Sequence, residues 1–286
     1  MMDEGSRREL ESCITRLSGA PAGEALPAEA GLVVAALFDA LERGELRSAE
    51  RDADGMWHAV PWVKRGILLA FRAGRLTDMS PPGSPIRFFD KHTVPVQPLD
   101  VRQGVRVVPG GTSIRRGAHI ARGVVCMPPS YVNVGAFVGE ETMIDSHALV
   151  GSCAQIGARV HLSAAAQVGG VLEPVGAVPV VIEDDVFVGG NCGVYEGTVV
   201  RERAVLASGV ILTRAVPVFD LVREAVYRAS DDRPLEIPPN AVVVPGSRSI
   251  RAGWGAEQGL ALQTPVIVKY RDSTTDASME LEEWLR

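Results

Sequence analysis

Aliphatic side chains recur at every sixth position from residue 114 onward. The series runs from Ile114 to Val168, breaks for fourteen residues, and continues from Ile182 to Val218, with Cys126 as its one member that is not Ile, Val or Leu. A second series of small or β-branched residues, beginning at Ala118, follows four residues behind the first. A β-sandwich would instead alternate with a period of two and turn roughly every 8–12 residues. The pattern therefore predicts a repeat architecture.

One large and one small inward position in every six residues suits a triangular coil. Each unit supplies a short strand and a turn, and three units close one coil of about 18 residues, so that stacked coils bury continuous aliphatic columns. This predicts a mainly β protein built on a parallel β-helix over residues 106–250. The break at residues 169–181 equals two units and two further residues, and it predicts an external loop of the kind that often carries function.

Glycines directly follow several of the large positions, and there we expect turns that use a positive φ. They are Gly139, Gly151, Gly157, Gly169 and Gly189.

The flanking segments predict different structure. Residues 1–105 read as an α-rich domain, with helical periodicity over 4–18 and 28–43, a helix opening at Pro61, and Asp54-Gly55 favouring a type I′ hairpin turn. The Pro-rich passage that follows, over residues 81–98, predicts an irregular connection. Residues 251–286 predict a small capping extension made of the strand LALQTPVIVKYR and a terminal helix SMELEEWLR.

The low aromatic content agrees with a narrow triangular coil, whose interior has room only for aliphatic and small side chains. Aromatic residues make up 5% of the chain, and only Tyr131, Phe137, Phe187 and Tyr195 fall within residues 114–218. The net charge of −6 gives no global attraction for nucleic acid or for an anionic membrane. No long apolar segment and no apolar signal core are present, so we expect a cytoplasmic protein without membrane contact. The four cysteines lack the spacing of a metal site or of a disulfide framework, and no metal is expected.

Three stretches outside and inside the repeat resemble one family. The segments RVVPGG, GSCAQIGARVHLS and VIVKYR look like those of the tetrahydrodipicolinate N-succinyltransferases, which belong to the hexapeptide acyltransferases, and the resemblance spans nearly the whole chain. It implies a left-handed coil, although the usual rule for parallel crossovers would give a right-handed one. It also implies a homotrimer with sites between subunits and no permanently bound cofactor.

The family resemblance implies a reaction. Succinyl passes from succinyl-CoA to the amine of tetrahydrodipicolinate, in its open form 2-amino-6-oxopimelate, during lysine and diaminopimelate synthesis. Two alternatives stay open: a paralogous N-acyltransferase that acts on a different amine, and a non-catalytic β-helix scaffold.

The same resemblance assigns site residues. Arg106, in Arg-Val-Val-Pro, matches the family arginine that binds the substrate, and a bidentate arginine suits a dicarboxylate. Asp145, in Met-Ile-Asp, matches the aspartate that contacts the substrate and is proposed to be catalytic. Because Asp145 follows the inward Ile144, its side chain should point outward at a corner, where it can bind an ammonium and assist its deprotonation. Arg214 and Arg248 are expected to bind CoA phosphates, within a group that also contains Arg223, Arg228 and Arg251.

Two positions depart from the family. His147 stands where familiar members carry a tryptophan, and it is a candidate base or substrate contact. Gly193 stands where they carry a glutamate proposed to act in catalysis, and Glu196 is the nearby acid. Either Glu196 substitutes for the missing acid, or Asp145 with backbone groups suffices, or the substrate differs.

Other reactive side chains are expected to be structural. Attack of an amine on a thioester needs no covalent nucleophile, so Cys153 is not expected to react. Cys126 and Cys192 fall at inward repeat positions and should fill the core. His119, His147 and His161 fall on three different faces of the coil, so they cannot converge on a metal, and His119 and His161 are expected to serve packing.

Overall fold

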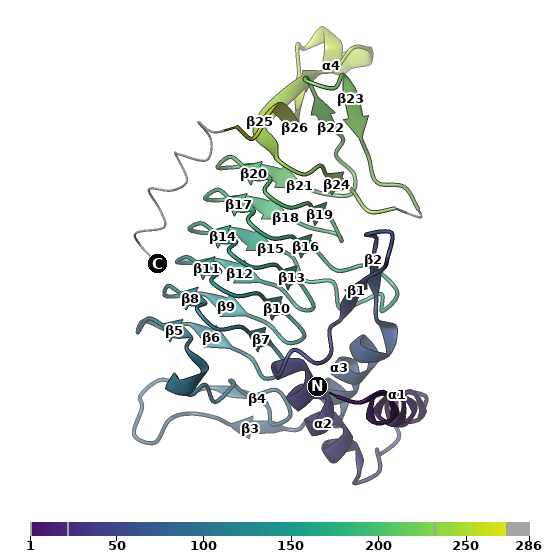
Figure 1. Cartoon of the computed structure of the whole chain (residues 1–286), viewed down its shortest axis with the longest axis vertical. Helices are drawn as coiled ribbons and strands as arrows, with labels where there is room; N and C mark the ends of the chain where they lie inside the picture. The colour runs from purple at the N-terminus through teal and green to yellow at the C-terminus, as the bar shows by residue number, and fades with distance from the viewer. Residues whose placement is uncertain (1, 22, 232, 273–286) are drawn as a thin grey trace.

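The computed structural model describes residues 2–21, 23–231 and 233–272. Its centre is a parallel β-helix whose two-residue strands lie on three faces (Figure 1). Along the chain the strands visit face A, face B and face C in turn. Face B contains β6 (Ser113–Ile114), β9 (Tyr131–Val132), β12 (Leu149–Val150), β15 (Gln167–Val168), β18 (Gly193–Val194) and β21 (Ile211–Leu212).

The other two faces extend further along the axis. Face C contains β7 (His119–Ile120), β10 (Phe137–Val138), β13 (Gln155–Ile156), β16 (Val181–Ile182), β19 (Val199–Val200) and β24 (Glu236–Ile237). Face A begins with β5 (Arg106–Val107), β8 (Val125–Cys126), β11 (Met143–Ile144), β14 (His161–Leu162), β17 (Phe187–Val188) and β20 (Val205–Leu206).

The predicted repeat positions form the core. Every residue of the large series is at most 7% exposed, and the small series is also buried except for the half-buried Val216. Strands pair in parallel with the strand one coil away, as Phe137 does with His119 and with Gln155, at a spacing of 18 residues. Like residues therefore stack on like, and the prediction of a parallel coil is confirmed.

The glycines that follow the large positions have a different role from the one expected. None of the five has a positive φ. A Cβ at Gly151 would lie 2.2 Å from the backbone nitrogen of Gly170, and one at Gly139 would lie 2.5 Å from the carbonyl carbon of Gly157. These glycines allow the corners of adjacent coils to approach. Positive φ occurs two residues later, commonly at residues other than glycine, such as His147 with φ 62° and Ala165 with φ 59°.

The external loop is present, but it replaces a different number of repeat units from the number predicted. Gln155 pairs with Val181, 26 residues further on, whereas it pairs with Phe137 of the preceding coil at the regular spacing of 18. The loop is thus one ordinary step between faces B and C that is lengthened by eight residues, and not two units with two residues added. Nζ of the buried Lys64 donates to the carbonyl of Ala177 at 2.5 Å and holds the loop against the N-terminal helices.

The N-terminal segment packs beside the first coils (Figure 1). Its helices are α1 (Glu4–Ser18), capped by Asp3, α2 (Ala30–Glu42) and α3 (Pro61–Ala73). Ile14, Leu37 and Ile67 are fully buried in their shared core, which also contains Val134 and Cys153 of the coil. The three predicted helices are confirmed.

Two local predictions in this segment need correction. β1 (Ala49–Arg51) and β2 (Trp57–Ala59) form the expected hairpin, but the loop spans residues 52–56 and only Gly55 in it has a positive φ, so the turn is not type I′. The region around the Pro-rich passage also contains a short antiparallel pair, β3 (Leu76–Asp78) and β4 (Phe89–Lys91), and a 3₁₀ turn (Val101–Gln103). The strand β4 avoids the prolines themselves.

The C-terminal end of the coil continues into a twisted extension of face A. It comprises β25 (Ala241–Ser249), β26 (Ala261–Tyr270), β22 (Val218–Asp220), β23 (Ala225–Tyr227) and the short α4 (Gly253–Glu257). The predicted strand near residue 265 is therefore confirmed, whereas the predicted terminal helix lies outside the described residues. The division into residues 1–105, 106–250 and 251–286 stays a prediction.

A buried carboxylate ties this extension together. Asp220, 2% exposed, accepts hydrogen bonds from the hydroxyl of Tyr270 at 2.6 Å and from the backbone N–H of Val222 and Arg223. Burial alone would raise the pKa of Asp220, but these hydrogen bonds outweigh it and hold the pKa below its usual value.

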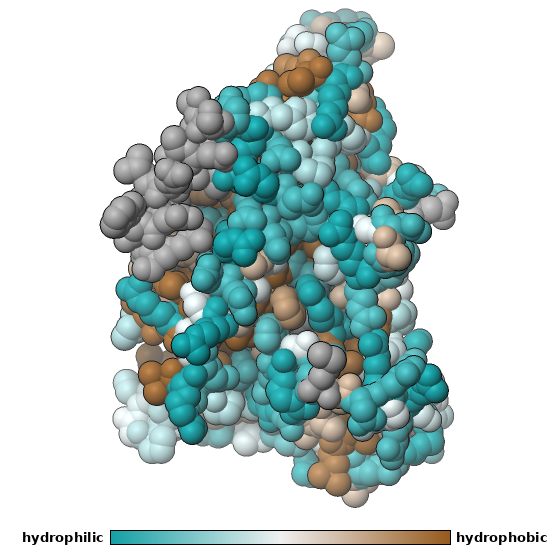
Figure 2. Space-filling view, viewed as in Figure 1, coloured by the Kyte–Doolittle hydropathy of each residue, from teal (hydrophilic) through white to brown (hydrophobic). Residues whose placement is uncertain are grey.

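The described surface shows no sign of a membrane span. None of the described helices is both long enough and apolar enough to cross a bilayer. The side shown in Figure 2 is mainly hydrophilic, and hydrophobic residues gather near the C-terminal extension and at the opposite end.

Candidate active site

Arg106 and Asp145 lie along face A. Arg106 opens β5 and pairs with Val125 of β8, which in turn pairs with Met143 of β11, and Asp145 comes two residues after Met143. Since adjacent strands are about 4.8 Å apart, the backbones of β5 and β11 are separated by about 10 Å. The guanidinium of Arg106 is exposed. An extended ligand with a carboxylate and an amine at its two ends can span this interval.

Asp145 occupies the corner between faces A and B. Its backbone N–H donates to Leu162 in the next coil at 2.9 Å, and its carboxylate accepts from the N–H of Ser146 at 2.6 Å. The side chain is partly exposed, as expected for a residue directly after an inward aliphatic. His147 lies at the same corner, is exposed, and takes its positive φ because it is the third corner residue. The structure thus brings Asp145 and His147 to one corner.

Face B carries two polar side chains that sequence reasoning missed. Gln167, one coil above His147, donates from Nε2 to the His147 carbonyl at 3.1 Å. Tyr195 covers Gly193: a Cβ at Gly193 would lie 2.4 Å from the Tyr195 ring and 2.9 Å from its hydroxyl oxygen. The aromatic ring therefore fills the space that a side chain at position 193 would need. Tyr195 was visible in the sequence only as one of the few aromatic residues within the coil.

Glu196 and Arg214 meet at the corner between faces B and C. Oε2 of Glu196 accepts from the backbone N–H of Arg214, one coil further, at 2.8 Å. The Arg214 guanidinium donates to the carbonyl of Ser230 at 2.9 Å and to the carboxylate of Asp231 at 3.1 Å, and it is exposed. Glu196 lies at a different corner from Asp145, so one chain does not bring these two acids together.

Arg248 lines an open cavity at the C-terminal end. The cavity has a volume of about 980 Å³ and is bordered by Arg248, Arg251 and apolar residues such as Phe219 and Leu262. Arg223 and Arg228 lie elsewhere, in a second pocket of about 470 Å³ that Arg233 also lines. The five arginines expected to form one group are therefore divided between two pockets and the corner at Arg214.

The buried thiols cannot act as nucleophiles in this state. Burial raises the pKa of Cys153 to about 11 and that of Cys126 to about 12, and burial also raises the pKa of Cys192. Cys126 and Cys192 are core residues as predicted, whereas Cys153 faces the N-terminal helices.

The histidines lie on separate faces. His119 is on face C and stacks on Phe137 with ring centroids 4.5 Å apart, and His161 on face A lies 5.0 Å from Phe187. Their packing roles are confirmed. Across residues 2–272, apart from the masked positions, no three His, Cys, Asp or Glu side chains are grouped in a way that could hold a metal ion.

Similarity to known proteins decides the family. Residues 20–73 match the family model described as tetrahydrodipicolinate N-succinyltransferase N-terminal, and residues 179–214 match the hexapeptide repeat of succinyl-transferase. A Nitrobacter hamburgensis protein named 2,3,4,5-tetrahydropyridine-2,6-dicarboxylate N-succinyltransferase is 43% identical over 87% of each chain. A Polynucleobacter asymbioticus protein of the same name is 40% identical over 92% of each chain. The chain belongs to the 2,3,4,5-tetrahydropyridine-2,6-dicarboxylate N-succinyltransferase family.

Solved structures are less similar to this succinyltransferase family member. A hexapeptide-repeat acetyltransferase from Vibrio cholerae is 21% identical, with a TM-score of 0.30 over 42% of this chain and 65% of that one. A Campylobacter jejuni protein assigned as a 2,3,4,5-tetrahydropyridine-2-carboxylate N-succinyltransferase is 14% identical, with a TM-score of 0.42 over 85% of this chain and 63% of that one. Scores this low do not establish a shared fold.

Proposed function

We propose that this protein transfers succinyl from succinyl-CoA to the amine of 2-amino-6-oxopimelate, the open form of tetrahydrodipicolinate, in lysine and diaminopimelate synthesis. The observation that carries the proposal is the 43% identity, over most of both chains, to a protein named for this reaction. The amine nitrogen attacks the thioester carbonyl, a C–N bond forms and the C–S bond breaks. One proton of the amine is transferred to the departing thiolate, which gives the free CoA thiol. Succinyl-CoA is a co-substrate, and no cofactor stays bound.

Arg106 and Asp145 bind the two ends of the acceptor. The guanidinium of Arg106 binds a carboxylate of the acceptor in the bidentate geometry that only arginine provides. The Asp145 carboxylate binds the ammonium and accepts its proton, which produces the neutral amine that the attack requires. His147, at the same corner, is the second group able to move this proton. The separation of about 10 Å between their strands fits a seven-carbon dicarboxylate.

Two side chains are candidates to replace the family glutamate that this chain lacks at Gly193. Glu196 has the right charge, but one of its oxygens already accepts the Arg214 N–H. The Tyr195 hydroxyl lies within 2.9 Å of where a Cβ at Gly193 would be, so it occupies the family position more directly. We assign Tyr195 as the hydrogen-bond donor that replaces the acid there, with Glu196 as the alternative.

CoA is bound by basic groups at the C-terminal end of the coil. The cavity at Arg248 and Arg251 combines two cations with apolar walls, a combination that suits a phosphorylated adenosine. Arg214 supplies a further cation at the corner beside Glu196.

The active unit is proposed to be a cytoplasmic homotrimer with a left-handed coil, as in the hexapeptide acyltransferases. We propose that the corner of Asp145 from one subunit lies against the corner of Glu196 and Arg214 from the next, because a single chain keeps these two corners apart. Exposed apolar residues of the C-terminal extension that do not line the Arg248 cavity, such as Trp254 and Leu260, are available to an interface.

The test is thiol release from succinyl-CoA in the presence of 2-aminopimelate. We expect acceptor-dependent release that Asp145→Asn lowers about 10²–10⁴-fold. Arg106→Lys should mainly raise KM for the acceptor, because lysine keeps the charge but loses the bidentate fork. Asp54→Asn, at the tip of the β1–β2 hairpin, is the matched control and should react like the wild type.

The two alternatives give other results. Transfer only to an unrelated amine would identify a paralogue, whereas the absence of both transfer and thermal stabilisation by CoA would identify a scaffold.

A further inference from the structure

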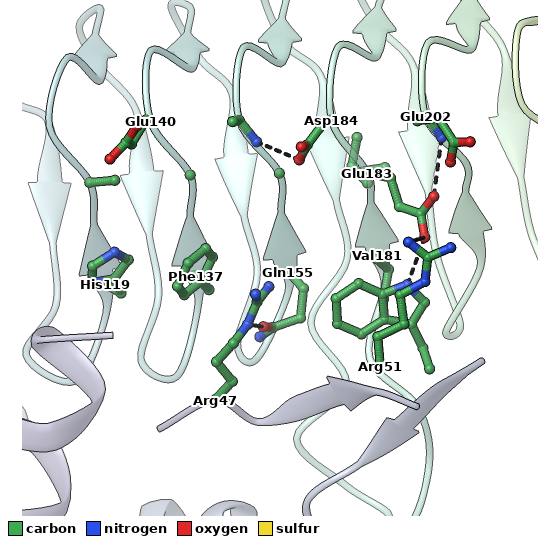
Figure 3. A pocket seen from close by; sticks show the side chains of 16 residues that line it. Arg47, Arg51, His119, Phe137, Glu140, Gln155, Val181, Glu183, Asp184 and Glu202 are labelled. Atoms are coloured by element: carbon green, nitrogen blue, oxygen red, sulfur yellow. Dashed lines mark hydrogen bonds and ion pairs between the residues drawn. The ribbon is translucent and has the colours of Figure 1, made fainter. Parts of the chain in front are cut away.

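A pocket of about 570 Å³ lies between the N-terminal segment and face C, away from Asp145 and Arg106. Face C contributes the outward side chains of His119, Phe137 and Gln155, and the N-terminal segment contributes Arg47 and Arg51 (Figure 3). The volume is in the range of small-molecule sites. The proposed acyl transfer uses none of these residues.

One wall of this pocket is basic. The Arg47 guanidinium stacks 3.7 Å over the Phe137 ring and donates from Nε to Oε1 of Gln155 at 2.8 Å, which fixes its plane. Among the described residues, the carboxylates of Asp184 and Glu50 attract Arg47 only from beyond ion-pair distance. Burial lowers the pKa of Arg47 to about 10, so the cation is poorly solvated although it stays charged at neutral pH. Such a preorganised guanidinium is well suited to a ligand carboxylate.

The opposite rim is acidic. Glu140 and Asp184 occupy equivalent places at the corners between faces C and A, and both are exposed. Two coil steps separate them, or about 10 Å. The intervening coil lines the pocket with Gly157 and Ala158, and the next residue at that corner, Arg159, is paired with Asp185 at 2.7 Å. Asp184 is held by the Ala158 N–H at 2.9 Å, and its other oxygen lies 3.9 Å from the Arg159 guanidinium.

The remaining charged side chains of the pocket are paired with other groups of the protein. Glu183 accepts from the Trp57 indole N–H at 2.8 Å and from the Arg201 guanidinium at 2.9 Å. A hydrogen bond to Glu183 raises the pKa of Glu202, because the protonated form of Glu202 donates to the Glu183 carboxylate. Arg51 lies 3.8 Å from Glu183. The groups available to a ligand are the partly buried guanidinium of Arg47, the exposed carboxylate of Glu140, and the exposed carboxylate of Asp184, which also accepts the Ala158 N–H.

We propose that this pocket binds a basic α-amino acid, with its carboxylate on Arg47 and its two ammonium groups toward Glu140 and Asp184. The methylene chain of the ligand would lie over Phe137 and the small corner residues. A dicarboxylate would place a negative charge against Glu140 or Asp184, and a simple diamine would leave Arg47 without a partner. Because the pocket joins the N-terminal segment to the coil, an occupied site ties these two parts together.

The test is calorimetric titration of the wild-type protein with L-lysine in the absence of succinyl-CoA. L-norleucine lacks the side-chain ammonium and cadaverine lacks the carboxylate, so both should bind at least about tenfold more weakly. The variant Glu140→Gln/Asp184→Asn should weaken lysine binding by a similar factor, because Asn keeps the acceptor for the Ala158 N–H but loses the charge. Glu11→Gln, an exposed acid on α1, is the matched control and should bind as the wild type does.

Other results would overturn the proposal. No heat with L-lysine up to about 10 mM would show that the pocket is not a site of useful affinity. Binding of cadaverine as tight as that of L-lysine would show that Arg47 does not bind the ligand carboxylate. Lysine binding that is lost in Asp145→Asn but kept in Glu140→Gln/Asp184→Asn would place the ligand in the active site instead. None of these readouts requires acyl transfer, so they stand apart from the test of the proposed function.

Discussion

Gly151 gives a sharp test of how the coils pack. A Cβ at this position would lie 2.2 Å from the backbone nitrogen of Gly170 and 2.6 Å from the carbonyl carbon of Gly169, and neither atom belongs to a flexible side chain. Overpacking of this kind costs roughly 1–3 kcal/mol. The loss of unfolded-state freedom in Gly→Ala returns about 0.4–1 kcal/mol. We therefore expect Gly151→Ala to lower the free energy of unfolding by about 1–2 kcal/mol.

The measurement is thermal unfolding at one fixed protein concentration, without ligand. For a chain of this size the unfolding entropy is about 0.6 kcal/mol/K, so the expected loss corresponds to a Tm lower by roughly 2–3 °C. Gly31→Ala is the matched control, because a Cβ at Gly31 in α2 meets nothing within 4 Å, and its Tm should equal or exceed that of the wild type.

A second substitution separates the two possible roles of this glycine. Asn tolerates positive φ better than most residues, so Gly151→Asn would be mild if the position needed that backbone conformation. The observed close approach predicts instead that Asn is at least as destabilising as Ala. A Tm for Gly151→Ala equal to that of the wild type would refute the packing argument.

Three further predictions concern single side chains. Folding lowers the pKa of the Asp220 carboxyl, so the charged form should stabilise the protein above its ordinary pKa of about 3.9. In a pH series of thermal unfolding, the loss of stability in Asp220→Asn should therefore be largest at neutral pH and shrink below about pH 4. A loss that does not change with pH would contradict this linkage. Tyr195→Phe should lower kcat about tenfold or more with little change in KM for CoA, and an unchanged kcat would leave Glu196 as the replacement for the family acid. Iodoacetamide at pH 8 should label the partly exposed Cys13 and leave activity intact, whereas loss of activity with label on Cys153 would contradict its buried, protonated state.

The coil could be predicted from sequence because its inward positions repeat. A buried column tolerates only aliphatic or small residues, so a period of six is visible in the chain from Ile114 onward. The glycines after these positions were also visible, but the sequence could not separate close backbone approach at Gly151 from a positive φ. The backbone of the neighbouring coil, which the repeat alone does not place, decides between them.

The proposed functional residues were harder to predict because they point outward, where the repeat sets no restriction. Arg106 and Asp145 were proposed from family motifs, and the structure places Arg106 on face A and Asp145 at the corner where that face ends. Tyr195 was missed because the relevant signal is the empty space over Gly193, which exists only in three dimensions. The pocket at Arg47 was missed for a similar reason, since it joins residues more than a hundred positions apart in the chain.

The central claim is that this protein couples cleavage of a thioester to acylation of an amine. The most direct measurement follows CoA thiol and the N-succinyl product together, in one reaction of the purified protein with succinyl-CoA and 2-aminopimelate. We predict that both appear in equal amounts, that neither appears without the acceptor, and that Asp145→Asn suppresses both. Thiol release without N-succinyl product, or no reaction at all, would contradict the claim.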